Sequence, residues 1–232
     1  IVLFFLFLVV EVGHDFGSPV AATCALFRPD VFRACVLMSA PFGGPPAWPF
    51  ATSATQGTAV SASALADPGM GAAFAELDPP RKHYQWYYST RPANSDMMNA
   101  PEGLQAFLRA YYHMKSADWA PNQPYPLEAW RADVMAVLPR YYVMDADRTM
   151  PESVAPAMPS DDEISACTWL PDNELAIYTQ EYARTGFQGG LQWYRCATGG
   201  LFGDDLKTMS GRSIDVPSAF ISGKSDWGSY QK

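Results

Sequence analysis

Histidine, cysteine and positive charge are all scarce in this chain of 232 residues. It has three histidines and four cysteines, with no Cys-x-x-Cys pair and no histidine at metal-ligand spacing from a cysteine. Neither a zinc site nor a disulfide framework is indicated. We therefore expect no metal or cofactor and a reducing compartment. The cysteines are expected to be small buried hydrophobic residues: Cys24, Cys35, Cys167 and Cys196.

Lysine and arginine number 16 against 24 acidic residues, which gives a net charge of −8 and a pI near 4.8. The basic residues are scattered and form no stripe, so a nucleic acid is not an expected partner. We expect a neutral small molecule instead. The oligomeric state stays open.

The apolar run IVLFFLFLVV at residues 1–10 is shorter than the roughly 20 apolar residues of a membrane span. It has no basic leader and no small-residue cleavage site, so it does not match a secretion signal. We therefore expect a core strand, no membrane span and a cytoplasmic location. Hydrophobic residues make up 48% of the chain, which is ample for a buried core.

The apolar run leads into GHDFG at residues 13–17, and Pro19 follows shortly after. A run bounded by glycine is typical of a buried parallel strand, and proline suits the first turn of a helix. Gly13 and Gly17 would let the backbone approach itself closely at such a strand-to-helix turn. That turn would lift Asp15 above the edge of the sheet. The alternative is an ordinary polar loop.

Strand signals recur over residues 33–39 and 216–222, and the stretch between residues 43 and 210 carries almost none. The pattern is a piece of parallel sheet, a large helical insertion and the sheet resumed, with strands ending near Val12, Ser39 and Ser222. The insertion is expected to contain a long loop to about Gly71, a helix opened by residues 99–102, a helix over 126–138, a short helix after a capping box from Ser160 to Glu163, and a helix over 172–185 followed by Gly186.

Four segments resemble those of epoxide hydrolases of the α/β-hydrolase fold. Residues 13–42, GHDFGSPVAATCALFRPDVFRACVLMSAPF, resemble the nucleophile elbow of that family, in which aspartate replaces the usual serine. HYQWYY at 83–88 and TGFQGGLQWYRC at 185–196 resemble two lid motifs, and ISGKSDWG at 221–228 resembles the end of the strand that carries the charge-relay acid.

The resemblance implies an α/β protein with a partial α/β-hydrolase sheet and a large helical lid, or cap. On this basis residues 1–42 and 211–232 belong to the hydrolase core, and residues 43–210 form the lid. It also implies hydrolysis of a small apolar epoxide by water to a vicinal diol.

The implied chemistry needs a nucleophile and an acid, because a strained cyclic ether has a poor leaving group. The resemblance makes Asp15 the nucleophile, which forms an aspartyl ester. It makes Tyr84 and Tyr194 the donors that hold and protonate the epoxide oxygen. The alternative for these two tyrosines is a place in the core of the lid, which is the commoner fate of a tyrosine.

The second half of the reaction hydrolyses the ester. The resemblance makes Asp226 the charge-relay acid that orients a histidine, while the backbone N–H of Phe16 stabilises the oxyanion. His14 and Trp193 are expected to line the substrate pocket. The alternative for Asp226 is a turn residue after a strand.

Two parts that the resemblance implies do not occur in this sequence: an upstream His-Gly-x-Pro turn and a downstream catalytic histidine. His83 and His113 stand in no motif and are expected to be hydrogen-bonded structural histidines. We therefore expect the chain alone to be incomplete, unstable and inactive beyond slow ester formation. A soluble monomer that unfolds cooperatively would contradict this expectation.

Two other functions stay open. A dehalogenase uses the same aspartate nucleophile on a carbon–halogen bond, but Phe16 directly after Asp15 and the paired tyrosines favour the epoxide. A noncatalytic remnant is favoured by the missing histidine and the missing upstream turn.

Overall fold

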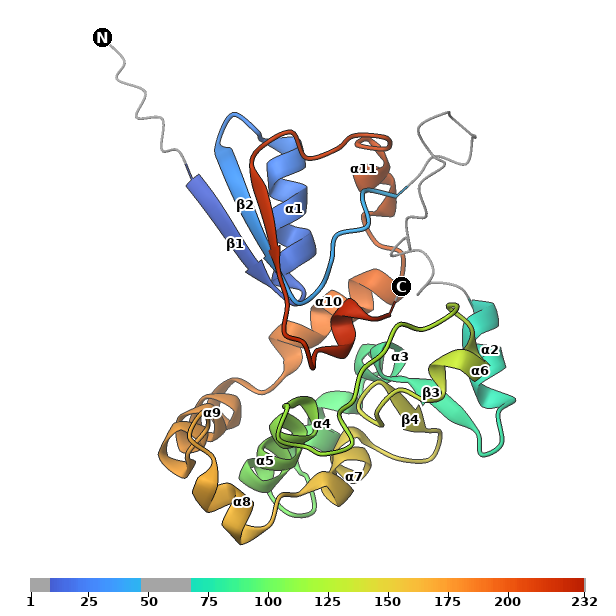
Figure 1. Ribbon diagram of the computed structural model, residues 1–232. Coiled ribbons are helices and arrows are strands. Elements are labelled where there is room, and N and C mark those ends of the chain that lie inside the picture. Colours follow the sequence, from blue (N-terminus) through green and yellow to red (C-terminus); the bar gives the residue numbers. More distant parts are fainter. Residues whose placement is uncertain (1–8, 47–67, 232) are drawn as a thin grey trace. The chain divides into compact units, whose positions relative to one another are not determined.

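The computed structural model describes residues 9–46 and 68–231. These residues form two compact units (Figure 1). The sheet unit contains residues 9–46, 124–126 and 202–231, and the helical unit contains residues 68–123 and 127–201. The domain boundaries predicted at residues 43 and 211 stay predictions.

Three parallel strands form the sheet unit, in the order β1 (Val9–His14), β2 (Phe32–Met38) and β5 (Ser218–Ile221). Helix α1 (Gly17–Phe27) connects the first two strands and carries Pro19 in its first turn, as predicted. The unit also contains α11 (Gly203–Lys207) and a 3-10 turn, η3 (Trp227–Ser229). The parallel strands and their connecting helix confirm the predicted α/β class. Small side chains make up the contact between α1 and the sheet: Ala21, Ala22 and Ala25 against Cys35 and Leu37.

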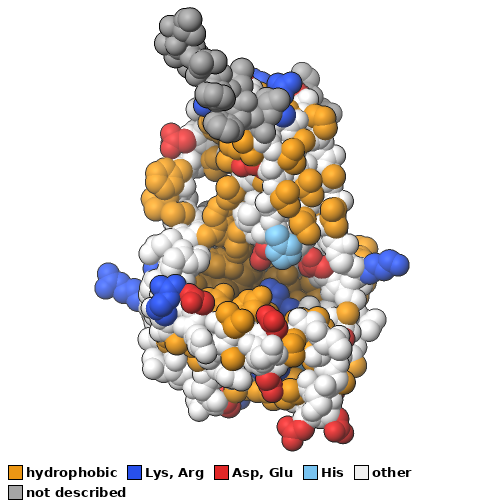
Figure 2. Space-filling model, turned by 90° about the vertical axis from the view of Figure 1, so that its left-hand side faces the viewer, with side chains coloured by type: hydrophobic (Ala, Val, Ile, Leu, Met, Phe, Trp, Pro, Cys, Tyr) orange, Lys and Arg blue, Asp and Glu red, His pale blue; other side chains and the backbone are white. Residues whose placement is uncertain are grey.

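The other face of this sheet is apolar and exposed. Side chains alternate along β1, so Val10 and Val12 point away from α1 and are 61% and 64% exposed. Ile221 of β5 pairs with Met38 on this face and is exposed as well, whereas its neighbour Phe220 lies on the same face of the sheet as α1. Hydrophobic side chains are accordingly visible along the surface of the sheet unit in Figure 2.

The helical unit packs short helices around an aromatic and methionine-rich core that includes Leu108, Met144 and Met150. Its elements are α2 (Pro68–Ala75), β3 (Arg81–His83), α3 (Tyr84–Ser89), α4 (Ala93–Met98), α5 (Leu104–Lys115), α6 (Ala132–Met135), β4 (Val143–Asp145), α7 (Met150–Val154), η2 (Ala155–Ala157), α8 (Asp161–Ala166), α9 (Asp172–Thr185) and α10 (Gln188–Thr198).

Two local predictions for this unit are confirmed. Ser160 and Glu163 form a reciprocal capping box at the start of α8, which is short as expected. Helix α9 spans residues 172–185, and Gly186 follows it with φ of +65°, a conformation that glycine adopts without strain.

The prediction of a helix over 126–138 was wrong, because only α6 is helical there. Leu127 is buried although its segment is irregular, so tertiary packing outweighs the local helix preference. Helix α5 begins at Leu104, after Gly103, and not at residues 99–102.

Among the described residues between 43 and 210 there are two short strands that the sequence did not predict. Strands β3 and β4 pair antiparallel over three residues each, which is too short to leave a period of two in the sequence. Of the predicted loop to Gly71, residues 47–67 lie outside the described residues, and residues 68–71 belong to α2.

All four cysteines are free thiols, and only Cys35 is buried. The other three are half-buried, so the prediction of buried hydrophobic residues holds for one of the four. In the part of the chain that the structure describes, no helix is long and apolar enough to cross a membrane.

Candidate active site

Asp15 lies in the turn between β1 and α1 and is exposed. Its φ of +53° is in the left-handed region, which aspartate tolerates better than most residues. Its backbone N–H donates to the carbonyl of Met38 at 3.0 Å, and its carbonyl accepts from the N–H of Ser18 at 3.0 Å. The predicted strand-turn-helix is therefore present, and the turn is hydrogen-bonded on both sides.

The two glycines of the turn differ in what they contribute. A Cβ atom on Gly13 would lie 2.0 Å from the carbonyl oxygen of Gly17, so a side chain there is sterically excluded. A Cβ atom on Gly17 would meet nothing within 4 Å. The close backbone approach predicted for this turn is therefore present: it needs a glycine at residue 13, and Gly17 contributes its backbone to the contact.

Asp226 follows β5 on the edge of the sheet where Asp15 follows β1, because carboxyl ends of parallel strands share an edge. One carboxylate oxygen of Asp226 accepts the N–H of Gly228 at 2.8 Å and caps η3. Asp226 is therefore a turn residue, which was the alternative that the sequence left open. Its charge-relay role stays a prediction. Ser229 donates to the carbonyl of Ser39 at 3.3 Å and ties this turn to the end of β2.

His14 and Phe16 flank Asp15 on either side of the turn. His14 is the last residue of β1 and is exposed, and Phe16 is the N-cap residue of α1. Their predicted roles, in the pocket and in the oxyanion site, are not decided by these positions.

In the helical unit the two tyrosines predicted from separate motifs lie side by side. Tyr84 is the first residue of α3 and Tyr194 is in α10. Their ring centroids are 5.7 Å apart with an interplanar angle of 77°, an edge-to-face contact. The ring of Tyr88 contacts both, at 5.6 Å from Tyr84 and 4.9 Å from Tyr194. Trp193 precedes Tyr194 on α10 and is 36% exposed.

Hydrogen bonds hold the two helices in this arrangement. The hydroxyl of Thr198 on α10 lies 2.8 Å from that of Ser89 on α3. Arg195, also on α10, donates to the carbonyl of Thr90 at 3.3 Å. The backbone N–H of Tyr84 donates to the carbonyl of Tyr142 at 2.8 Å, which fixes the start of α3.

Sequence reasoning missed Tyr88 and Gln85. Tyr88 is buried, and its hydroxyl lies 3.5 Å from that of Tyr111. Burial and the nearby phenols of Tyr111, Tyr194 and Tyr84 raise the pKa of Tyr88 well above its usual value. Helical spacing was the available signal, because Tyr88 is four residues after Tyr84 and shares its face of α3.

His83 is structural but not hydrogen-bonded, which corrects the expectation from the sequence. It is 2% exposed, and neither ring nitrogen has a partner among the described residues. It packs among the rings of Phe74, Tyr84, Trp86 and Trp130. Burial lowers the pKa of His83 from 6.5 to about 3, so the imidazole is neutral in the folded unit.

Lowering the pH is expected to destabilise the helical unit through His83. The unfolded chain binds a proton at this residue below about pH 6.5, and the folded unit does so only near pH 3. Stability therefore falls as the pH drops between these values, by about 3 kcal/mol at pH 4.5. Urea unfolding of wild type and His83→Leu, followed by tryptophan fluorescence at pH 7 and pH 4.5, measures this loss. Equal losses of stability in both proteins would contradict it.

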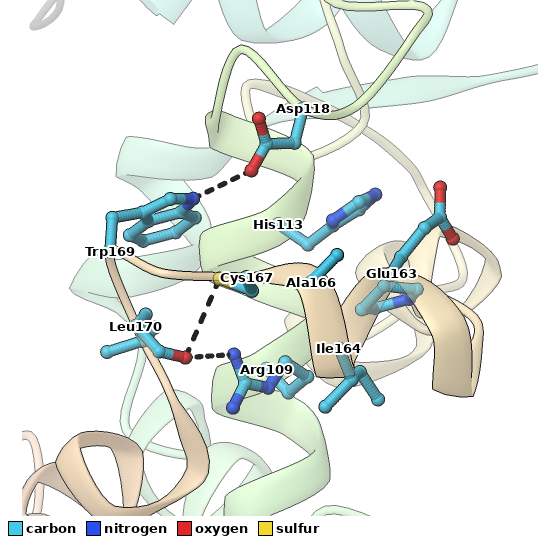
Figure 3. A pocket seen from close by; sticks show the side chains of 10 residues that line it. Arg109, His113, Asp118, Glu163, Ile164, Ala166, Cys167, Trp169 and Leu170 are labelled. Carbon is cyan, nitrogen blue, oxygen red and sulfur yellow. Dashed lines mark hydrogen bonds between the residues drawn. The ribbon is translucent and has the colours of Figure 1, made fainter.

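His113 lines a separate pocket of about 190 Å³ between α5 and the segment from α8 to Leu170 (Figure 3). Arg109 donates to the carbonyl of Leu170 at 2.6 Å and to Asp172 at 2.7 Å. The indole of Trp169 donates to Asp118 at 2.7 Å. None of the predicted active-site residues lines this pocket. Within the described ranges, no three acidic, histidine or cysteine side chains gather as metal ligands.

Comparison with solved structures identifies the fold. An epoxide hydrolase from an endophytic Streptomyces matches with a TM-score of 0.63 and 24% identity, over 94% of this chain and 53% of that one. Potato (Solanum tuberosum) epoxide hydrolase I matches with a TM-score of 0.57 and 21% identity, over 96% and 54%. At this identity the likeness shows the fold, and the chain has the α/β-hydrolase fold in part, with a helical cap.

Sequence comparison finds relatives that are named epoxide hydrolases. Epoxide hydrolase B of Mycobacterium tuberculosis is 26% identical over 226 residues, which are 94% of this chain and 57% of that protein. The epoxide hydrolase of Caballeronia sordidicola is 26% identical over 94% of this chain and 51% of that protein. Epoxide hydrolase A of M. tuberculosis is 43% identical over 61 residues, 25% of this chain and 17% of that protein.

No family model matches the chain. The chain spans about half the length of the two curated relatives that match nearly all of it. The predicted resemblance to the epoxide hydrolases of the α/β-hydrolase fold is confirmed.

Proposed function

We propose that this chain opens small apolar epoxides by forming an ester on Asp15. The observation that carries the proposal is the contact between Tyr84 and Tyr194, whose rings lie 5.7 Å apart although they come from separate helices. Two adjacent phenols suit an oxygen that gains negative charge. The elbow geometry at Asp15 and the relatives named epoxide hydrolase support the same chemistry.

In the first step a carboxylate oxygen of Asp15 attacks one ring carbon of the epoxide. The carbon–oxygen bond to that carbon breaks, and the released oxygen takes a proton from a phenol of Tyr84 or Tyr194. A phenol with a pKa near 10 is a suitable donor, because the alkoxide that it protonates is a much stronger base. Both phenols stabilise the charge as it develops.

In the second step water hydrolyses the ester and releases a vicinal diol. We propose that Asp226 orients the histidine that activates this water and that the N–H of Phe16 stabilises the oxyanion. His14 and Trp193 would line the substrate pocket. None of the three histidines in this sequence is assigned to this role.

The ester intermediate of the first step allows a direct test. After incubation with styrene oxide, intact-mass spectrometry should show a gain of one epoxide molecule, and peptide mapping should place it on Asp15. Tyr84→Phe and Tyr194→Phe should each slow this gain about 100-fold, because each removes one donor to the developing charge. Tyr178→Phe, which changes an exposed tyrosine on α9, is the control and should have no effect.

The same experiment with a chloroalkane separates the alternatives. Release of chloride and an ester from the chloroalkane, with none from styrene oxide, would reverse the assignment in favour of a dehalogenase. No adduct from either compound on the folded chain would favour a noncatalytic protein. An adduct on a residue other than Asp15 would refute the nucleophile assignment.

A further inference from the structure

The side chain of Gln85 lies against the hydroxyl of Tyr84. Its amide Nε2 donates to the phenol oxygen at 3.1 Å. The amide oxygen of Gln85 is buried and has no partner among the described residues. The contact therefore uses the donor end of the amide and leaves the acceptor end unused.

We propose that Gln85 is a positioning residue for Tyr84: it occupies the phenol oxygen as a donor, so that the hydroxyl proton of Tyr84 is directed to the epoxide oxygen. This inference rests on the proposed function. It adds to that function a residue that no motif in the sequence singles out.

The direction of the hydrogen bond decides what Tyr84 can do. A phenol oxygen accepts hydrogen bonds and donates one. When Gln85 fills an acceptor position, the hydroxyl proton remains for another acceptor. An N–H donor also stabilises a phenolate more than a phenol, because hydrogen bonds to charged groups are stronger, so Tyr84 becomes the stronger acid.

Packing leaves the hydroxyl little other freedom. The ring of Tyr84 is enclosed by edge-to-face contacts with Tyr88 at 5.6 Å, Tyr142 at 5.3 Å and Tyr194 at 5.7 Å. The ring cannot move away without disturbing these contacts. Rotation of the hydroxyl proton about the bond between ring and oxygen is the remaining freedom, and the N–H of Gln85 restricts it.

The unpartnered amide oxygen fits this role. A buried acceptor without a partner destabilises a fold, so such atoms in native structures call for a functional explanation. Turning the amide over would place its oxygen against the hydroxyl of Tyr84 and would take up the proton. The observed orientation is the one that keeps Tyr84 a donor.

Three variants test the role. Gln85→Met keeps the length of the side chain and removes the N–H donor, and Gln85→Glu presents a carboxylate that accepts the hydroxyl proton. Gln85→Asn keeps the amide on a shorter side chain and serves if the methionine variant does not fold. Gln105→Met changes an exposed glutamine on α5 and is the matched control.

The first measurement does not depend on catalysis. The titration of Tyr84 is followed by NMR of tyrosine labelled with ¹³C at the ring carbon that bears the hydroxyl, with the signal assigned by Tyr84→Phe. We expect Tyr84 to titrate at a higher pH in Gln85→Met and Gln85→Glu than in wild type. Gln105→Met should titrate as wild type does.

The second measurement is the rate of ester formation with styrene oxide as a function of pH. Gln85→Met should lower the maximal rate about tenfold, with the half-saturating epoxide concentration unchanged, and should move the basic limb of the profile to higher pH. Gln85→Glu should lower the maximal rate more than Gln85→Met does, because its carboxylate accepts the hydroxyl proton of Tyr84.

The outcomes separate the two proposals. If wild type forms the ester while Gln85→Met leaves both the titration of Tyr84 and the rate unchanged, the role of Gln85 is refuted and the proposed function stands. A lower rate with an unchanged titration would also refute it, because lost packing alone has that effect. If Tyr84 titrates at higher pH in Gln85→Met but wild type forms no ester, the hydrogen bond is supported and the proposed function fails.

Discussion

Asp15→Asn is expected to abolish ester formation from epoxides, with a loss of about 10⁴-fold or more in rate. An amide oxygen is a far weaker nucleophile than a carboxylate, so the attack on the ring carbon fails. Asparagine adopts the left-handed conformation as readily as aspartate, and the φ of +53° at this residue is therefore kept. The measurement is the mass gain after incubation with styrene oxide, with circular dichroism to show that the fold is intact.

Asp30→Asn is the matched control for this variant. Asp30 is an exposed carboxylate of the same unit and is paired with Arg28 at 2.8 Å. The Asp30→Asn variant should form the ester on Asp15 at the wild-type rate, because exposed ion pairs contribute little to stability. An undiminished mass gain in Asp15→Asn would show that another residue is the nucleophile.

Gly13→Ala is expected to disrupt the turn that carries Asp15, at a cost of about 3 kcal/mol or more in stability of the sheet unit. The added methyl group would lie 2.0 Å from the carbonyl oxygen of Gly17, so β1 and α1 must separate. The backbone hydrogen bond from Asp15 to Met38 would be lost with this movement. Hydrogen exchange at the amides of β1 and β2 measures the loss of protection.

Gly17→Ala provides the control within the same turn. A methyl group there meets nothing within 4 Å, and Gly17 is the first residue of α1, where alanine is the better helix former. We expect unchanged or slightly higher protection of the same amides. Equal losses in the two variants would mean that the close approach of the backbone at Gly13 does not determine the turn.

Elements specified by neighbouring residues could be predicted from the sequence. The turn from β1 into α1 depends on Gly13 and on a left-handed residue after it, and both are local properties. The capping box at Ser160 and the glycine after α9 are local signals too. The parallel pairing of β1 with β2 follows from the short helical connection between them.

The sequence predicted those residues of the candidate site that stand in recognisable motifs, but not their arrangement in space. Tyr84 and Tyr194 were found by resemblance, but no pattern in the sequence places one ring beside the other. Gln85 was missed because its role depends on which end of its amide meets the hydroxyl of Tyr84. His83 was expected to be hydrogen-bonded, and only packing shows that aromatic rings surround it.

The sequence by itself determined the turn that carries Asp15, the capped helices and the α/β class, because these depend on steric limits and hydrogen bonds between residues close in the chain. Tertiary structure alone decided the contact of Tyr84 with Tyr194, the irregular segment around Leu127 and the pairing of β3 with β4. Such contacts join residues far apart in the chain, and their free energy comes from burial, which local preferences do not encode.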